Sequence, residues 1–142
     1  MKSILKKNSH SQEDTIQLGR QFGAMLKEGD IVLLMGDLGC GKTTITKGII
    51  SALTGVDPND VTSPSFTIIQ DYEGGIPVKH VDLYRLDNPQ DIFELGLESP
   101  IEKNVVVVEW GEKIRSWFQN PYIVAMDWID ENTRSIEIMT PG

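Results

Sequence analysis

A glycine-rich loop between an apolar pentapeptide and a helix-like segment constrains the fold of this chain more than any other feature. The loop, Gly36–Thr43, fits the pattern G-x-x-x-x-G-K-S/T. It follows Ile31–Met35, a short apolar run typical of a strand that is buried on both faces. Beyond the loop, apolar side chains recur at helical spacing as far as Gly55, a typical helix stop. This order of elements predicts an α/β fold built around a phosphate-binding loop.

A first helix is predicted upstream of this unit. Ser11 can cap its start, Asp14 lies in the capping-box position, and Gly29 supplies a stop. Between them, four apolar side chains fall on one helical face: Leu18, Phe22, Met25 and Leu26. This spacing predicts a helix that packs one side against the core.

Two hairpins, a short helix and a second central strand are predicted downstream. The hairpin strands are, in pairs, Phe66–Tyr72 with Ile76–Leu83 and Ile123–Ile129 with Arg134–Met139. Val105–Val108 is a second fully apolar run, and Asn88-Pro89 is typical of a helix cap and first helical residue. We therefore expect one domain, residues 1–142, with an α/β, P-loop NTPase-like layered fold. Its central sheet would be mixed parallel and antiparallel and flanked by helices.

The glycine loop carries the strongest chemical signal. Its glycines let successive backbone N–H groups turn towards phosphate oxygens, and the N-terminus of the following helix adds partial positive charge. Lys42 is expected to reach the β- and γ-phosphates of a nucleotide, and the Thr43 hydroxyl is a natural Mg²⁺ ligand. A chance glycine-rich turn is the alternative, and the flanking strand and helix argue against it.

Two acids end strand-like runs and are candidates to hold the metal. Glu109 directly follows Val105–Val108, the pattern of a Walker B strand with glutamate in place of the commoner aspartate. Asp82 ends the run from Val78. The alternatives are that Glu109 caps a following helix and that Asp82 pairs with Arg85.

Ser63–Thr67 lies between the loop helix and the first hairpin. In P-loop hydrolases such a segment often carries a hydroxyl that responds to the γ-phosphate, and a plain Ser-Pro turn explains it equally well. Asp71–Gly74 matches the D-x-x-G of GTPases, but it lies in a predicted hairpin and no N-K-x-D sequence accompanies it. His80 is interpreted as a packing or hydrogen-bonding residue, since the only other histidine is His10.

Composition narrows the function classes. The net charge of −8 disfavours extensive direct binding to a phosphodiester backbone, so little or no direct contact with nucleic acid is expected. Cys40 is the only cysteine, which excludes an internal disulfide and fits a reducing cytoplasm. The basic N-terminus has no apolar stretch behind it, and no apolar run approaches the ~20 residues that span a bilayer. A soluble cytoplasmic domain is expected.

Four motifs, in this order along the chain, closely resemble those of the TsaE family, formerly YjeE: Gly36–Thr44, Ser63–Thr67, His80–Leu86 and Val108–Trp110. Members of that family are small bacterial ATPases needed to make threonylcarbamoyladenosine on tRNA. The resemblance covers essentially the whole chain. The combination of motifs is specific, whereas the glycine loop alone would not be.

The resemblance implies a set of site residues. ATP or ADP would be bound by Ser11 near the base and by the loop residues Gly39, Cys40, Gly41, Lys42, Thr43 and Thr44. Thr43 and Glu109 would hold Mg²⁺. Activity would require Lys42, Asp82, Glu109 and Trp110. The resemblance also implies two partner proteins, TsaD and TsaB, with docking on TsaD close to the ATP site.

Two residues depart from the family pattern. Cys40 stands where alanine is usual, which would place a sulfur beside the phosphates. A thiol at a helix N-terminus is also expected to have a lowered pKa and to be reactive. Ser65 stands where threonine is usual and keeps the hydroxyl. Trp110 is either a core residue or part of the nucleotide or partner surface, and the resemblance favours the second. Arg85 could stabilise γ-phosphate charge or pair with a nearby acid.

The leading hypothesis is a Mg²⁺-dependent ATPase that is slow alone and works with TsaD and TsaB in tRNA modification. One alternative is an ATP-dependent docking subunit that does not hydrolyse. A small-molecule P-loop kinase is disfavoured, because the chain has no Arg cluster and little room for an acceptor pocket.

Overall fold

A mixed β-sheet forms the frame of the molecule. The computed structural model describes residues 1–37, 40–64, 67–97 and 103–140, and over these ranges it contains seven strands in one sheet. The sheet order is β1-β7-β6-β2-β5-β4-β3. In chain order the strands are β1 Lys2–Ser9, β2 Ile31–Met35, β3 Ile69–Tyr72, β4 Val78–Asp82, β5 Val105–Glu109, β6 Tyr122–Asp130 and β7 Thr133–Thr140.

The centre of the sheet is parallel and its margins are antiparallel. β2 lies between β5 and β6 and is parallel to both, and β4 continues the parallel set beside β5. β3 pairs antiparallel with β4, β7 with β6, and β1 with β7. The mixed sheet predicted from the sequence is therefore confirmed, as are both hairpins. Thr67 and Ile68 lie outside β3, β4 is shorter than expected, and Phe66 lies outside the described residues.

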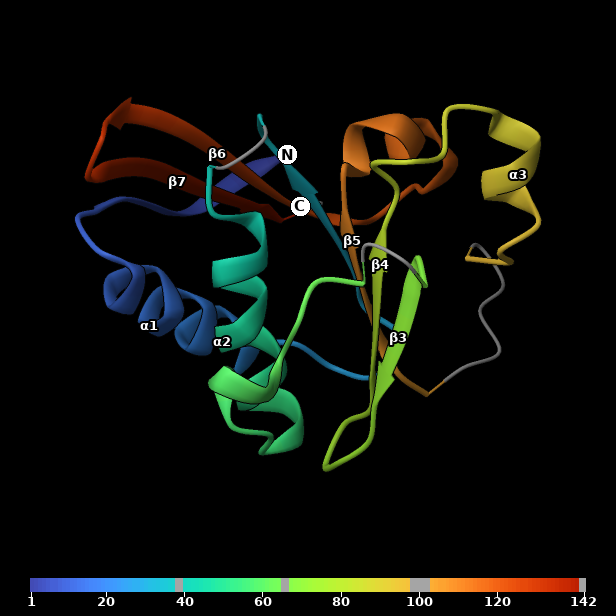
Figure 1. Cartoon of the computed structure of the whole chain (residues 1–142), viewed down its shortest axis with the longest axis horizontal. Coiled ribbons are helices and arrows are strands. Elements are labelled where there is room, and N and C mark those ends of the chain that lie inside the picture. Colours follow the sequence, from blue (N-terminus) through green and yellow to red (C-terminus); the bar gives the residue numbers. More distant parts are fainter. Residues whose placement is uncertain (38–39, 65–66, 98–102, 141–142) are drawn as a thin grey trace.

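Helices cover both faces of the sheet (Figure 1). α1 (Gln12–Gly23) and α2 (Lys42–Thr54) pack together on one face, and α2 is followed by the short 3-10 helix η1 (Pro58–Asp60). α3 (Pro89–Phe93) and the 3-10 segment η2 (Gly111–Trp117) lie on the other face. The side chains of β5 alternate between the two cores, because Val105 and Val107 join the first cluster whereas Val106 and Val108 join the second.

Several local predictions are confirmed. Ser11 caps α1, its hydroxyl accepting from the Asp14 amide at 3.1 Å. Asn88 caps α3 with Pro89 as the first helical residue, and Gly55 ends α2 in the left-handed conformation at φ 84°. Each of these ends follows from local backbone chemistry rather than from tertiary contacts, so the sequence pattern was sufficient.

The extent of α1 was predicted wrongly, and one strand was missed. α1 ends at Gly23 rather than near Gly29, and Met25 is 54% exposed instead of facing the core. β1 was not predicted as a strand at all. Its side chains are exposed apart from Leu5 and Ser9, so it carries almost no apolar alternation, and it is held by pairing with β7. A strand of this kind is fixed by backbone hydrogen bonds that leave little trace in the sequence.

Glycines set the close approach of α1 and α2, which leads to a prediction about Gly48. A Cβ at this position would collide with the Ile16 carbonyl oxygen and lie 2.9 Å from the Arg20 nitrogen. Helix propensity alone would make Gly48→Ala stabilising by about 0.5–1 kcal/mol. We expect the opposite sign, a loss of about 1–3 kcal/mol, because the added methyl overpacks the contact. Urea denaturation monitored by circular dichroism measures this change, and an unchanged or higher stability would contradict the packing described.

Among the helices of the described residues, none is both long enough and apolar enough to cross a membrane.

Candidate functional site

The phosphate loop joins the carboxyl end of β2 to the N-terminus of α2. Gly36 and Gly41 have φ values of 149° and 104°, which side-chain-bearing residues rarely adopt. A Cβ on Gly36 would also lie 2.6 Å from both the Cys40 sulfur and the Met126 carbonyl oxygen. The loop thus needs glycine at these two positions, as the motif requires. Gly39, expected to bind phosphate, lies outside the described residues.

Lys42 opens α2 and is buried, with 5% of its surface exposed. Its ammonium group donates a hydrogen bond to the Gly36 carbonyl oxygen and lies 3.4 Å from the centroid of the Trp110 ring. Both contacts hold the charge above the loop, and the second is a cation–π interaction. The ammonium is therefore positioned at the loop from two sides.

Glu109 ends β5 and contacts the first turn of α2. The Thr43 hydroxyl donates to its carboxylate, at 3.0 Å from Oε1 and 3.2 Å from Oε2. His80 Nε2 is 2.7 Å from Glu109 Oε2, and the histidine is fully buried. Among the described residues, His80 Nδ1 has no hydrogen-bond partner. Thr43 and Glu109, which the resemblance implies as the ligands of Mg²⁺, are thus in contact. The hydrogen-bonding interpretation of His80 is confirmed.

Asp82 ends β4, directly beside Glu109 in the sheet register. Its Oδ1 accepts from the Tyr84 amide at 2.9 Å, and its Oδ2 accepts from the Ser63 hydroxyl at 3.4 Å. The segment that carries Ser63 therefore reaches this acid. Thr67 is exposed, whereas Ser65 lies outside the described residues.

Trp110 follows Glu109 in a left-handed conformation, with φ 62° and ψ 39°. A bulky residue in this region is unusual and costs on the order of 1–3 kcal/mol, which the surrounding structure must offset. The indole is partly buried, and its ring centroid lies 5.2 Å from that of Tyr84. Trp110 thus forms a wall beside Lys42 instead of filling the interior of the core.

The prediction for Cys40 was wrong. Its side chain is fully buried in the core cluster between the helices and the sheet, so the lowered thiol pKa expected from the sequence is not found. Desolvation by burial raises the pKa of the thiol above its ordinary value, and this outweighs the lowering effect of the Lys42 charge. The helix N-terminus and the lysine favour the thiolate and so lower the pKa, but their effect on the pKa is smaller here than that of removing the thiol from water. Any contact of Cys40 with a nucleotide would therefore be made by its backbone.

The raised pKa and the full burial of Cys40 predict that its thiol reacts slowly with alkylating reagents. Since the thiolate is the nucleophile, we expect iodoacetamide to modify Cys40 at pH 7.5 at least several-fold more slowly in the native protein than in urea. The rate should stay low until the pH rises above the ordinary thiol range. Intact-mass spectrometry over time measures both rates. Equal rates in the native and unfolded protein would contradict this burial.

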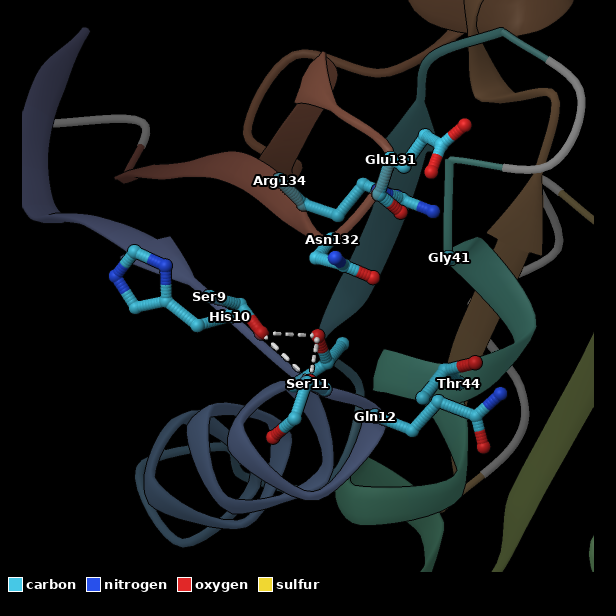
Figure 2. A pocket seen from close by; sticks show the side chains of 10 residues that line it. Ser9, His10, Ser11, Gln12, Gly41, Thr44, Glu131, Asn132 and Arg134 are labelled. Carbon is cyan, nitrogen blue, oxygen red and sulfur yellow. Dashed lines mark hydrogen bonds between the residues drawn. The ribbon is translucent and has the colours of Figure 1, made fainter.

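A pocket of about 260 Å³ opens beside the phosphate loop. Figure 2 shows that three chain segments line it: the β1–α1 junction, the start of α2 and the β6–β7 turn. The lining residues are Ser9, His10, Ser11, Gln12, Thr15, Gly41, Thr44, Glu131, Asn132 and Arg134. The sequence had placed Ser11 and Thr44 in one nucleotide site, and the structure brings them to one cavity.

Hydrogen bonds order the N-terminal side of this pocket. Ser9 Oγ lies 2.6 Å from Thr15 Oγ1 and donates to the Ser11 carbonyl oxygen at 2.8 Å (Figure 2). On the opposite side, the Arg134 guanidinium donates to the carbonyl oxygens of the turn, at 3.1 Å for Asp130 and 3.2 Å for Glu131. Both walls are therefore held by contacts within the protein.

The oxygen atoms near the loop suit a hard cation. Thr43 offers a hydroxyl and Glu109 a carboxylate, and Mg²⁺ prefers oxygen ligands of this kind. Within the described ranges, no three His, Cys, Asp or Glu residues cluster in a way that could hold a metal by themselves. A Mg²⁺ ion that takes its remaining ligands from nucleotide phosphates and water fits this set, because it usually binds proteins through few groups.

Sequence reasoning missed two parts of the site. The side of the pocket formed by Glu131, Asn132 and Arg134 had been interpreted only as a hairpin, since nothing in a turn sequence shows where its tip will lie. The contact between His80 and Glu109 was also missed. A signal existed, because His80 and Asp82 are two residues apart on one strand face, next to the strand that Glu109 ends.

Comparisons with known proteins show similarity to one family. The model of the family described as "Threonylcarbamoyl adenosine biosynthesis protein TsaE" matches residues 9–136. The tRNA threonylcarbamoyladenosine biosynthesis protein TsaE of Rickettsia felis is 39% identical over 133 residues, which cover 92% of this chain and 77% of that protein. The TsaE of Nostoc sp. is 40% identical over 134 residues, covering 89% and 80%.

A solved structure is similar in fold as well as in sequence. The crystal structure of Bacillus subtilis YdiB matches with a TM-score of 0.74 and 31% sequence identity, covering 97% of this chain and 86% of that one. The P-loop architecture with its mixed sheet is thus shared with a known structure. Together with the family match over residues 9–136, this means that the chain belongs to the TsaE family of threonylcarbamoyladenosine biosynthesis proteins.

Proposed function

We propose that this chain is a Mg²⁺-dependent ATPase that works with TsaD and TsaB in forming threonylcarbamoyladenosine on tRNA. The observation that carries the proposal is the contact of Thr43 with Glu109, directly after the buried Lys42 at the start of α2. This arrangement combines a phosphate-binding ammonium with oxygen ligands for a metal, the parts that phosphoryl transfer needs. Bound Mg²⁺ would neutralise charge on the phosphate oxygens.

The chain's own residues have distinct proposed roles. The backbone of the loop and Lys42 bind and orient the β- and γ-phosphates. Thr43 and Glu109 hold the metal, and His80 orients the Glu109 carboxylate through their 2.7 Å contact. Asp82, next to Glu109 in the sheet, is placed to position a water molecule or a metal-bound water. The pocket that Ser11 and Thr44 line takes the nucleoside.

Partner dependence is proposed from the exposed side of this site. Tyr84 is 52% exposed and Trp110 is partly exposed, so the wall beside Lys42 faces solvent. Electrostatic stabilisation is strongest in a dry, preorganised environment. Docking of TsaD, with TsaB, would cover this wall and exclude water, so that hydrolysis is slow alone and faster in the complex. The acidic chain would contact tRNA little, and a cytoplasmic location fits this role.

Two other functions remain as alternatives. A docking subunit that binds ATP without hydrolysing it would use the same loop and pocket, but the paired acids Glu109 and Asp82 favour chemistry. A small-molecule kinase would need an acceptor pocket as well, and the cavity beside the loop, about 260 Å³, is already proposed for the nucleoside. Single-turnover release of inorganic phosphate, measured with and without TsaB and TsaD, separates hydrolysis from docking.

Nucleotide choice is tested by calorimetry. We expect ATP and ADP to bind and GTP to bind at least about 10-fold more weakly, a difference of about 1.4 kcal/mol. The reason is that the sequence contains no guanine-reading N-K-x-D motif. CTP and UTP serve as controls for binding through phosphates alone. Equal affinity for ATP and GTP would count against the assignment of ATP.

The role in tRNA modification is tested in cells. Depletion of the protein should leave tRNA lacking threonylcarbamoyladenosine, as measured by mass spectrometry of tRNA nucleosides. Re-expression of the wild-type chain should restore the modification, whereas the Lys42→Ala chain at equal abundance should not. An unchanged level of the modification after depletion, in cells without a redundant pathway, would overturn the proposed function and leave the nucleotide site intact.

A further inference from the structure

Lys113 is a partly buried point of contact between two segments that follow neighbouring strands. It lies in η2, three residues after Trp110, and its ammonium group reaches across to the segment after β4. There it donates to the carbonyl oxygens of Leu83 at 2.8 Å, Tyr84 at 3.2 Å and Leu86 at 2.9 Å. The fourth acceptor is Asp87 Oδ1 at 3.0 Å. Four oxygens thus surround an ammonium that has three N–H donors.

The carbonyl contacts matter more than the ion pair. The Asp87 side chain is 93% exposed, whereas that of Lys113 is 22% exposed. A salt bridge to so exposed a partner contributes little. The three carbonyl oxygens, by contrast, belong to the backbone of one short segment, so the ammonium fixes the path of that segment.

The fixed segment carries groups of the nucleotide site. The Tyr84 amide donates to Asp82 Oδ1 at 2.9 Å, and the Tyr84 ring packs against Trp110 at 5.2 Å between centroids. Trp110 in turn lies under the Lys42 ammonium. Displacement of residues 83–87 would therefore disturb both the orientation of the Asp82 carboxylate and the wall beside Lys42.

We propose that Lys113 is a positioning residue for ATP hydrolysis and that its ammonium occupies a site with the coordination of a monovalent cation. Backbone carbonyl oxygens arranged around a point can replace the hydration shell of K⁺. Removal of the lysine side chain leaves three such oxygens and the Asp87 carboxylate around the vacated space. The Lys113→Ala protein is then expected to become K⁺-activated, while the wild-type protein is indifferent to K⁺. Only the part of this inference that concerns kcat rests on the proposed ATPase function.

The experiment compares Lys113→Ala with wild type in KCl, NH₄Cl and choline chloride at equal ionic strength. In choline chloride we expect kcat to fall by about 10–10²-fold, since small displacements of positioning groups have effects of this size. The Kd for ADP without Mg²⁺ should change less than about threefold, because the loop itself is untouched. K⁺ and NH₄⁺ should restore most of kcat, and choline should restore none.

Amide hydrogen exchange gives a readout that needs no ATPase activity. The Leu86 amide is bonded to the Leu83 carbonyl oxygen at 3.0 Å, and the Leu83 amide to the Glu109 carbonyl oxygen at 3.2 Å. In Lys113→Ala, exchange across residues 83–87 should accelerate in choline chloride and slow again in KCl. If wild type hydrolyses no ATP, the proposed function fails, and the exchange data still decide the role of Lys113.

Three variants complete the test. Lys113→Met fills the space with an apolar chain, so its faster exchange should not respond to K⁺. Asp87→Asn removes only the exposed carboxylate and should behave nearly as wild type. If Lys113→Ala does not fold, Lys113→Arg replaces it, since a planar guanidinium cannot point at the same four oxygens and exchange should rise without a K⁺ response. Amide exchange in Lys113→Ala at the same rate as in the wild-type protein would overturn the proposal. So would the same response to salt in the alanine and methionine variants.

Discussion

Replacement of Lys42 by alanine should weaken ATP binding by about 10²-fold or more. A hydrogen bond to a charged group is worth about 1.5–3 kcal/mol, and the ammonium is proposed to contact two phosphate groups. The lysine is already held at the loop by the Gly36 carbonyl oxygen and the Trp110 ring, so little order has to be gained on binding. Isothermal titration calorimetry with ATP and ADP measures the loss.

Lys47→Ala is the matched control for Lys42→Ala. It removes a positive charge from the same helix, α2, but the residue is not among those that line the pocket beside the loop. We expect its ATP affinity to stay within about threefold of wild type, since Lys47 is partly open to solvent, which screens its charge. Melting curves of both variants check that the fold is retained. An ATP affinity of folded Lys42→Ala close to that of Lys47→Ala would refute the proposed phosphate contact.

Glu109→Gln should lose most ATP hydrolysis, by about 10²–10³-fold, while it keeps much of its affinity for ADP without Mg²⁺. Loss of one preorganised electrostatic group typically has this effect on rate. Glutamine has the same shape and can still contact Thr43 and His80, so the change tests the negative charge and not the packing. Single-turnover phosphate release at saturating ATP measures the rate, and calorimetry measures ADP affinity.

Two comparisons interpret the Glu109→Gln result. Glu94→Gln removes an exposed carboxylate at the end of α3 and should hydrolyse ATP at the wild-type rate. Asp82→Asn tests the neighbouring acid in the same way. If Glu109→Gln hydrolyses ATP normally and Asp82→Asn does not, the metal role belongs to Asp82, and the proposed pairing of Thr43 with Glu109 around Mg²⁺ is wrong.

The centre of the fold could be predicted from the sequence because its signals are local or strongly apolar. β2 and β5 are buried on both faces, so each appears in the sequence as a continuous apolar run. The loop between β2 and α2 is recognised by its glycines. Glu109 was found for the same reason, since an acid that ends a buried strand is conspicuous. These features depend on neighbours in the chain.

The rest depended on contacts between distant residues. Cys40 shows this most clearly, because the helix N-terminus predicts an activated thiol whereas the core that surrounds it decides the outcome. The pocket side formed by the β6–β7 turn and the cation-like site of Lys113 also require the folded chain. In the pocket a turn, and around Lys113 a set of backbone oxygens, contact residues tens of positions away in the chain. A sequence pattern does not show such contacts.

The position of β1 at the sheet edge has a consequence for synthesis on the ribosome. Lys2 pairs with Thr140 and Ser9 with Arg134, so β1 finds its partner only after on the order of 130 further residues have been translated. At about 5–20 residues per second, that strand waits on the order of ten seconds with its hydrogen-bonding groups unpaired. Its lysines at positions 2, 6 and 7 are suited to this interval, since charged side chains discourage pairing with the wrong strand. These lysines thus protect β1 of the nascent chain from pairing with a wrong strand until β7 has been synthesised.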